Sequence, residues 1–255
     1  MTHRTLMALA IALALPLSAL PLSALAADPV AVMTKAFDRG KSKSTTATME
    51  MILKAANGNE NKRELKMESL GRDKQLMWFV APNDLRGTAL LNVKEDGVQK
   101  MWLYLPAFKN TNRVSGKRKR DSFMGSEFTY EDMNDRKVED FELSYVKEDT
   151  LNGAKVHVIE GKVKDKDSAY SRVVFYVDDE HNEIQKTDMY SVAGDLAKVM
   201  TIRKIEVIDG HRIPTQMEMK TMSDGDSTLL NLKAVKINVE IPEAHFSERY
   251  LPKVN

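Results

Sequence analysis

The chain has 255 residues, with 38 lysines and arginines against 37 aspartates and glutamates, and it contains no cysteine. This balanced charge argues against nucleic acid as a partner, because nucleic-acid binding favours a basic surface. The absence of cysteine excludes a disulfide framework and an anchor through a lipidated cysteine. The length fits one domain or two.

The first 26 residues predict a cleaved export signal. Arg4 supplies a positive n-region, an apolar run with the repeat "LPLSALPLSALA" follows, and the run ends in "ALA", a small-residue cleavage site. We therefore expect cleavage near Ala26 and a periplasmic protein. Residues 27–255 are expected to form a single domain. No later segment is long and apolar enough to span a membrane.

A single amphipathic helix is predicted at the start of the mature chain. Asp28 is a good N-cap, and Pro29 suits the first helical position. Apolar side chains recur at helical spacing up to Gly40, namely Val30, Met33, Ala36 and Phe37. The pattern predicts a helix over 29–40, which either packs on a sheet or serves a functional role.

After Ser42 the apolar pattern changes to a period of two, which is typical of β-strands. The turn "NGN" at 57–59 joins the first two strand-like runs into a hairpin. Further runs are expected at about 74–81, 87–94, 98–104, 137–148, 154–164, 170–178, 183–191, 196–208, 211–222 and 226–239, most of them separated by turn signals. This pattern predicts a mainly β protein of about a dozen antiparallel strands, arranged as a barrel or a large curved sheet.

The region 105–136 breaks the strand pattern. Its stretch "FMGSEFTYEDM" combines aromatic, acidic and glycine residues, with a short helix expected near Ser126–Met133. We interpret the stretch as a lid or rim, in which Gly125 permits a turn. Its apolar contacts are expected to be Phe123, Met124, Phe128 and Tyr130.

Methionines occupy alternate strand positions, namely Met49, Met51, Met67, Met217 and Met219. Methionine is unbranched and polarizable, so it fits irregular apolar shapes. These residues either fill an ordinary core or line a cavity that accepts acyl chains. About eight strands already suffice to fill a closed sheet, so a dozen strands favour a cavity. Its expected lining comprises the helix, strand and lid residues Met33, Phe37, Met49, Met51, Leu53, Leu65, Met67, Trp78, Leu90, Trp102, Tyr104, Phe123, Met124, Phe128, Tyr130, Met217 and Met219.

The sequence offers little for catalysis. Its histidines stand apart, without the spacing of a metal pair, and no nucleophile or phosphate-binding motif is present. We expect no enzyme activity, no metal site and no cofactor. A basic cluster near the lid either forms a solvated loop or binds anionic headgroups or an acidic partner; it comprises Arg113, Lys117, Arg118, Lys119 and Arg120.

Four strings carry a resemblance to a known family: "FVAPNDLRGTALL" (79–91), "MWLYLPAFKNTNRV" (101–114), "SFMGSEFTYEDM" (122–133) and "IPEAHFSERYL" (241–251). The chain resembles exported outer-membrane lipoprotein-sorting, or LolA-like, proteins, in the branch that accompanies resistance-nodulation-division exporters. The resemblance implies an unclosed antiparallel barrel of about eleven strands, with helices covering a hydrophobic cavity on its concave face.

The resemblance also implies a function. We expect a periplasmic carrier that holds a lipid, a lipoprotein acyl chain or another apolar molecule between the inner and outer membranes. Its partners would be an inner-membrane exporter and an outer-membrane acceptor, and the protein is expected to be a monomer. The alternative is an accessory or sensor subunit that binds an exporter or an envelope signalling protein without carrying cargo.

Overall fold

The computed structural model describes residues 27–38 and 42–254, so the expected export signal and Gly40 lie outside the described residues. The predicted helix is α1 (Pro29–Asp38). Asp28 caps it as expected, since its Oδ1 accepts a 3.0 Å hydrogen bond from the backbone N–H of Val30. In the described part of the chain, no helix combines the length and apolarity needed to cross a membrane.

All strands of the described chain belong to one antiparallel sheet of thirteen strands, in the order β6-β5-β4-β3-β2-β1-β13-β12-β11-β10-β9-β8-β7. The end strands β6 and β7 do not pair, so the sheet is not closed, which confirms the predicted unclosed antiparallel barrel. The strands are β1 (Ser44–Lys54), β2 (Glu60–Leu70), β3 (Lys74–Ala81), β4 (Ala89–Glu95), β5 (Val98–Leu105), β6 (Asn110–Arg113), β7 (Phe141–Leu151), β8 (Ala154–Val163), β9 (Tyr170–Asp178), β10 (Ile184–Ser191), β11 (Leu196–Ile208), β12 (His211–Thr221) and β13 (Ser227–Ile237).

Tight turns set much of this topology. In the hairpins β4–β5 and β11–β12, an aspartate and a glycine both adopt positive φ, at 50° and 78° for Asp96 and Gly97 and at 47° and 79° for Asp209 and Gly210. Two successive residues at positive φ form the type I′ turn, whose twist matches that of the flanking strands. The turn signals in the sequence are confirmed at these sites.

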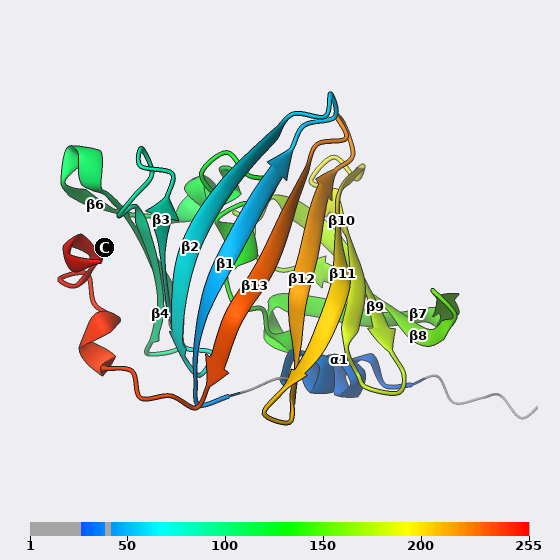
Figure 1. Cartoon of the computed structure of the whole chain (residues 1–255). Helices are drawn as coiled ribbons and strands as arrows, with labels where there is room; N and C mark the ends of the chain where they lie inside the picture. Colours follow the sequence, from blue (N-terminus) through cyan, green and yellow to red (C-terminus); the bar gives the residue numbers. More distant parts are fainter. Residues whose placement is uncertain (1–26, 39–41, 255) are drawn as a thin grey trace, which may run out of the picture.

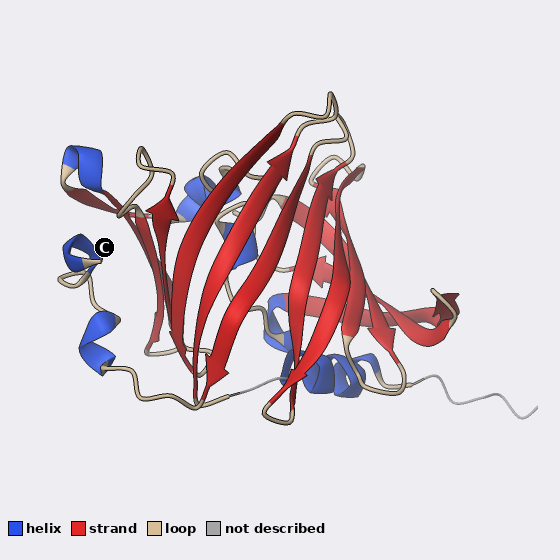
Figure 2. Ribbon diagram, in the orientation of Figure 1, coloured by secondary structure: helices blue, strands red, loops and turns tan. Residues whose placement is uncertain are grey.

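The sheet curls into a half-pipe, and the segment between β6 and β7 lies inside the curl with α1 at one end (Figure 1). Besides α1, only short 3-10 helices are present among the described residues (Figure 2). They are η1 (Pro106–Phe108), η2 (Gly116–Arg120), η3 (Glu131–Met133), η4 (Val138–Asp140), η5 (Glu243–His245) and η6 (Leu251–Lys253).

Two local expectations are corrected. The short helix expected near Ser126–Met133 is reduced to η3, because Ser122 and Thr129 pair as a β-bridge and the chain between them forms turns and bends, with Met124 and Gly125 at positive φ. The strand expected at 137–148 starts only at Phe141, because Val138–Asp140 form η4. The sheet also has thirteen strands where the resemblance implied about eleven.

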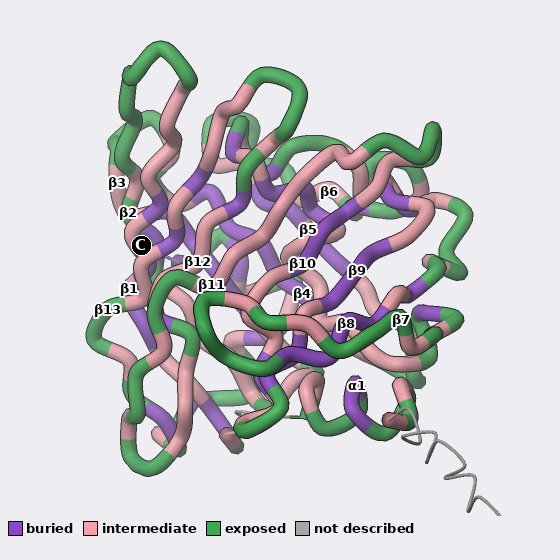
Figure 3. The backbone as a smooth tube through the Cα atoms, turned by 90° about the vertical axis from the view of Figure 1, so that its right-hand side faces the viewer, coloured by how far each residue is buried: buried purple, intermediate pink, exposed green. Residues whose placement is uncertain are grey.

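The two faces of the sheet bury different residues. The concave face carries the main core, which reaches from Met33 on α1 through β1–β5 to Phe175 on β9. A second cluster lies on the outer face of β3–β5, where the C-terminal residues Phe246 and Leu251 cover Leu76 and Leu91. Figure 3 shows that buried residues follow the strands, while the hairpin tips are exposed.

Candidate functional site: a methionine-lined hollow under a polar-anchored strap

A strap formed by residues 121–136 lies across the concave face. Phe123 is only 1% exposed, and its ring centroid lies 5.8 Å from that of Phe79 on β3 and 5.6 Å from that of Tyr130. Phe128 is buried in the same core. These aromatic contacts fill one part of the concave face, so the strap both covers this face and occupies part of its interior.

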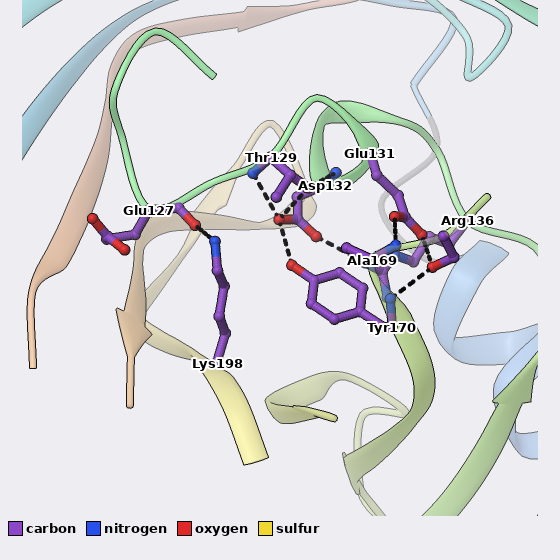
Figure 4. Close-up of polar contacts among 9 residues, drawn as sticks. Glu127, Thr129, Glu131, Asp132, Arg136, Ala169, Tyr170 and Lys198 are labelled. Atoms are coloured by element: carbon purple, nitrogen blue, oxygen red, sulfur yellow. Dashed lines mark hydrogen bonds and ion pairs between the residues drawn. The ribbon is translucent and has the colours of Figure 1, made fainter. Parts of the chain in front are cut away.

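One side of the strap is anchored to β11, β12 and β13 through Glu127. Its backbone N–H donates a 2.9 Å hydrogen bond to Thr228 Oγ1, and its carboxylate accepts one from Thr221 Oγ1. Its carbonyl oxygen accepts a hydrogen bond from Lys198 Nζ (Figure 4). Glu127 therefore connects the strap to three adjacent strands.

The other side is anchored to the start of β9. Asp132 Oδ2 accepts hydrogen bonds from the Tyr170 hydroxyl at 3.0 Å and from the Thr129 N–H and hydroxyl at 2.9 Å each. Asp132 Oδ1 lies 3.0 Å from Arg136 Nη2. Glu131 accepts a 2.8 Å hydrogen bond from the Ala169 N–H, as Figure 4 shows. This buried, charge-assisted network holds the strap more firmly than neutral hydrogen bonds would.

Arg72, in the turn between β2 and β3, joins the strap to α1. Its guanidinium binds the Asp135 carboxylate, with 2.6 Å between Nε and Oδ2. It also donates to the carbonyl oxygens of Phe37 and Arg136, the latter at 2.6 Å. Burial raises the pKa of Asp135 although Arg72 acts in the opposite direction. Asp135 is half-buried, and its ionised form is favoured by Arg72 and also by the nearby charge of Lys137.

Beside the strap the concave face is hollow. One hollow of about 500 Å³ lies between the strap and β1–β3, β12 and β13, and a second of about 410 Å³ lies between α1 and β10–β13. They are contiguous, because both are lined by Met67, Ser69, Met200, Pro214, Met217 and Leu232. Six methionines line the larger hollow, namely Met49, Met67, Met77, Met133, Met200 and Met217.

Most of the expected cavity residues lie on the concave face. Met33, Met51, Leu65, Leu90, Phe123, Tyr130 and Met219 belong to its buried core, and Phe37, Leu53 and Met124 pack against that core. The residues that border the larger hollow itself are Met49, Met67, Phe128 and Met217. These expected residues therefore share the concave face with the hollow, and many of them form its packed part rather than the wall of the hollow.

Three expected cavity residues lie on the opposite face. Trp78, Trp102 and Tyr104 belong to the outer cluster beneath the C-terminal residues. The reason is strand alternation: Met77 and Phe79 point inward, so Trp78 between them points outward. The structure thus corrects the assignment of these three residues to the cavity.

The basic cluster is divided into two paired side chains and three exposed ones. Lys119 forms an ion pair with Asp165, and Arg120 donates hydrogen bonds of 2.9 Å to two backbone carbonyls at Lys166 and Asp167. These two side chains fasten η2 to the loop before β9. The remaining members, Arg113, Lys117 and Arg118, are exposed.

One group of described residues offers metal-ligand atoms. Asp178, His181 and Glu183 have ligand atoms within 4.8 Å of one another at the turn between β9 and β10. Arg212 already holds Glu183 through contacts of 2.6 and 3.0 Å, and His181 Nδ1 lies 3.1 Å from Asp178. Arg212 therefore already pairs with one of the three candidate ligands, Glu183.

Several site residues were not anticipated from the sequence, above all Arg72, Asp132 and Tyr170. Each acts through a partner that is distant in the chain: Arg72 and Asp135 are 63 residues apart, and Asp132 and Tyr170 are 38 apart. A single sequence carries no signal for such pairs. The strand methionines Met77 and Met200 could have been identified from the alternation that revealed Met67, whereas Met133 lies in η3 and follows no such pattern.

Comparison with known proteins gives consistent results. A family model described as "uncharacterized protein" matches residues 71–253. An outer-membrane lipoprotein-sorting protein domain from Vibrio parahaemolyticus is 34% identical, with 88% of this chain and 97% of that chain covered and a TM-score of 0.81. A DUF1329 family protein from Desulfovibrio piger is 27% identical, with 88% and 100% covered and a TM-score of 0.81.

A LolA superfamily protein from Nitrosomonas europaea shares the fold, with 19% identity, 89% of this chain and 100% of that chain covered and a TM-score of 0.73. No curated protein sequence matches the chain. The sequence identity, the coverage and the unclosed sheet support the resemblance that the four sequence strings indicated. The chain therefore belongs to the family of outer-membrane lipoprotein-sorting protein domains and has a LolA-like fold.

Proposed function

We propose that the protein is a periplasmic carrier that shields the acyl chain of a lipid or lipoprotein in the methionine-lined hollow. The observation behind this proposal is the pair of contiguous hollows on the concave face, bounded by α1 and the strap. Their volumes fall in the range of about 300 to 1,000 Å³ that is usual for small-molecule sites. The methionine side chains can adapt to chains of different shape.

Burial of the chain would supply the affinity. Each methylene removed from water contributes about 0.8 kcal/mol, so one chain suffices for useful binding. The strap would regulate access, because its contacts to β9, β11, β12 and β13 are polar and can be exchanged for water when it lifts.

Handover would require partners at the two membranes. We propose an inner-membrane exporter as donor and an outer-membrane protein as acceptor, with the carrier acting as a monomer. Support comes from the exposed side chains of Arg113, Lys117 and Arg118, which offer positive charge to an acidic partner or an anionic headgroup.

The first test is cargo. Protein purified from its own cell envelope is examined by native mass spectrometry, and uptake of a fluorescent fatty acid is measured by titration. We expect bound lipid and saturable uptake. Ligand-free protein that takes up no fatty acid would contradict the proposal.

A variant locates the binding site. Met217→Trp fills the region shared by both hollows and should weaken uptake at least about tenfold, roughly 1.4 kcal/mol. The control is Met222→Trp, because Met222 is 43% exposed and borders neither hollow. Equal uptake by the two variants would place the chain elsewhere.

A second function has one observation in its favour. The strap already fills part of the concave face with Phe123, Phe128 and Tyr130, as expected for an accessory or sensor subunit that carries no cargo. That function predicts that charge reversal at Arg113, Lys117 and Arg118 abolishes capture of an envelope partner. Intact partner binding by the reversed variant would exclude these residues from the interface.

A further inference from the structure

The larger hollow has two chemically distinct sets of lining residues. One set comprises methionines, leucines and Phe128. The other comprises four side-chain carboxamides, from Gln75, Asn92, Gln99 and Asn134. Gln75 joins the two sets, because its Nε2 donates a 3.7 Å hydrogen bond to Met67 Sδ. We call these four side chains the amide cluster.

Asn92 has an acceptor without a partner in the amide cluster. The residue is 4% exposed, and its Nδ2 lies 3.0 Å from the carbonyl oxygen of Met133 and 3.4 Å from Gln75 Oε1. Both of those oxygens can only accept, which fixes the nitrogen of Asn92 toward them. Its Oδ1 is consequently the free atom, and it has no hydrogen-bond partner in the described chain.

Asn134 repeats the pattern from the strap. Its Oδ1 is also buried and lacks a hydrogen-bond partner among the described residues. Buried acceptors are nearly always satisfied in folded proteins, and leaving one unpaired is costly. Two unpaired acceptors in the wall of one hollow point to a ligand that brings hydrogen-bond donors.

The charged residues in the same wall are already paired. Arg72 binds Asp135, Lys74 binds Glu243, and Asp132 binds Arg136 at 3.0 Å. These pairs include every charged side chain that lines the larger hollow in the described chain. An ionic headgroup would find no free counter-charge there.

We propose that the amide cluster binds the uncharged, hydrogen-bond-donating polar group of a single-chain lipid, a hydroxyl or amide N–H adjoining the acyl chain. This inference rests on the proposed carrier function and specifies its ligand. The chain lies among the methionines, and the donors reach Asn92 Oδ1 and Asn134 Oδ1. Neutral carboxamides accept such donors without the desolvation cost of a charge.

The test uses four ligands with the same dodecanoyl chain: the monoacylglycerol, the ethanolamide, the methyl ester and the free carboxylate. Each displaces a fluorescent fatty acid from the full mature protein. We expect the two donor-bearing lipids to bind about tenfold more tightly than the methyl ester, the cost of an unmet hydrogen bond. The carboxylate should be weaker than both.

Two variants assign the preference to the cluster. Asn92→Leu should bind all four lipids alike. If this variant folds poorly, Gln99→Leu is measured in its place, because the Gln99 side chain makes no hydrogen bond within the described chain. Gln99→Leu should reduce the preference for the two donor-bearing lipids. The control is Asn231→Leu on β13, which bonds Gln216 at 2.8 Å and borders neither hollow; it should keep the preference.

The outcomes are distinguishable. Equal affinity of the wild-type protein for all four ligands, or tightest binding of the carboxylate, overturns this inference and leaves the carrier function standing. An unchanged preference in folded Asn92→Leu also overturns it. Failure of every ligand to bind contradicts the carrier function itself.

Discussion

The Tyr170 hydroxyl donates a 3.0 Å hydrogen bond to Asp132 Oδ2, and this contact joins the strap to the first residue of β9. Burial, reinforced by the charge of Asp132, raises the pKa of Tyr170 well above its usual value. The hydroxyl therefore stays protonated and keeps donating under ordinary conditions. Removing each partner in turn measures how firmly the strap is held.

Tyr170→Phe should lower the free energy of unfolding by about 1 to 2 kcal/mol, because Asp132 keeps its bonds to Thr129 and Arg136. Asp132→Ala should cost more, about 3 to 5 kcal/mol, because it strands the half-buried Arg136 guanidinium. Urea denaturation of both variants measures the difference. Equal losses would show that the ion pair adds nothing to the network.

Locking the strap tests whether it must move. The chain has no cysteine, so Glu127→Cys with Thr228→Cys introduces the only two thiols. These residues already bond at 2.9 Å between the Glu127 nitrogen and Thr228 Oγ1. The oxidised double variant should take up a fluorescent fatty acid at least about tenfold more slowly, since lid opening gates many binding sites. Reduction should restore the rate, and equal rates in both redox states would mean that cargo enters without strap movement.

Alkaline pH should destabilise the protein through Tyr176. Its hydroxyl donates a 3.0 Å hydrogen bond to Asp188 Oδ2, and burial together with this carboxylate raises its pKa to about 12. The folded state then holds the proton above the unfolded pKa of about 10, so this stabilisation is complete below that pH and is lost as pH rises toward 12. Urea midpoints between pH 8 and 11.5 should fall less steeply for Tyr176→Phe, and parallel slopes would refute this assignment.

The outer cluster should matter for stability and not for cargo. Leu251 is fully buried against β4 by the C-terminal residues. Leu251→Ala should lower the free energy of unfolding by about 2 to 5 kcal/mol through the cavity it leaves. Fatty-acid affinity of the folded variant should be unchanged, because the hollow lies on the other face. If fully folded Leu251→Ala also loses fatty-acid affinity, the outer cluster and the hollow are energetically coupled.

Local patterns predicted most of the fold. Alternation and the turns at Asp96–Gly97 and Asp209–Gly210 identified strands whose register the hairpins then determine. The same alternation that brought Met67 and Met217 to the concave face also puts Trp78 on the outer one. Trp78 was assigned to the cavity because an aromatic side chain suits either face, although its position between the inward-facing Met77 and Phe79 puts it on the outer face, where the C-terminal residues cover it.

The sequence predicted the existence of the strap and its apolar contacts, but not the polar contacts that anchor it. Its apolar residues Phe123 and Phe128 were expected to contact the interior, and they do. Nothing in the string indicates that its acidic residue Asp132 is buried against Tyr170. Tertiary packing turned an apparently solvated charge into an anchor, and this depends on strands that lie far along the chain.

The thioethers of the hollow also expose the protein to chemical damage. Oxidation turns methionine into a polar, chiral sulfoxide, so reactive oxygen species would convert the apolar wall of the hollow into a polar, hydrated one. Met67 and Met217, both half-buried, would react before Met51 and Met219, which are fully buried. A LolA-like sheet lined in this way would lose the apolar character of its hollow at a degree of oxidation that leaves the fold intact.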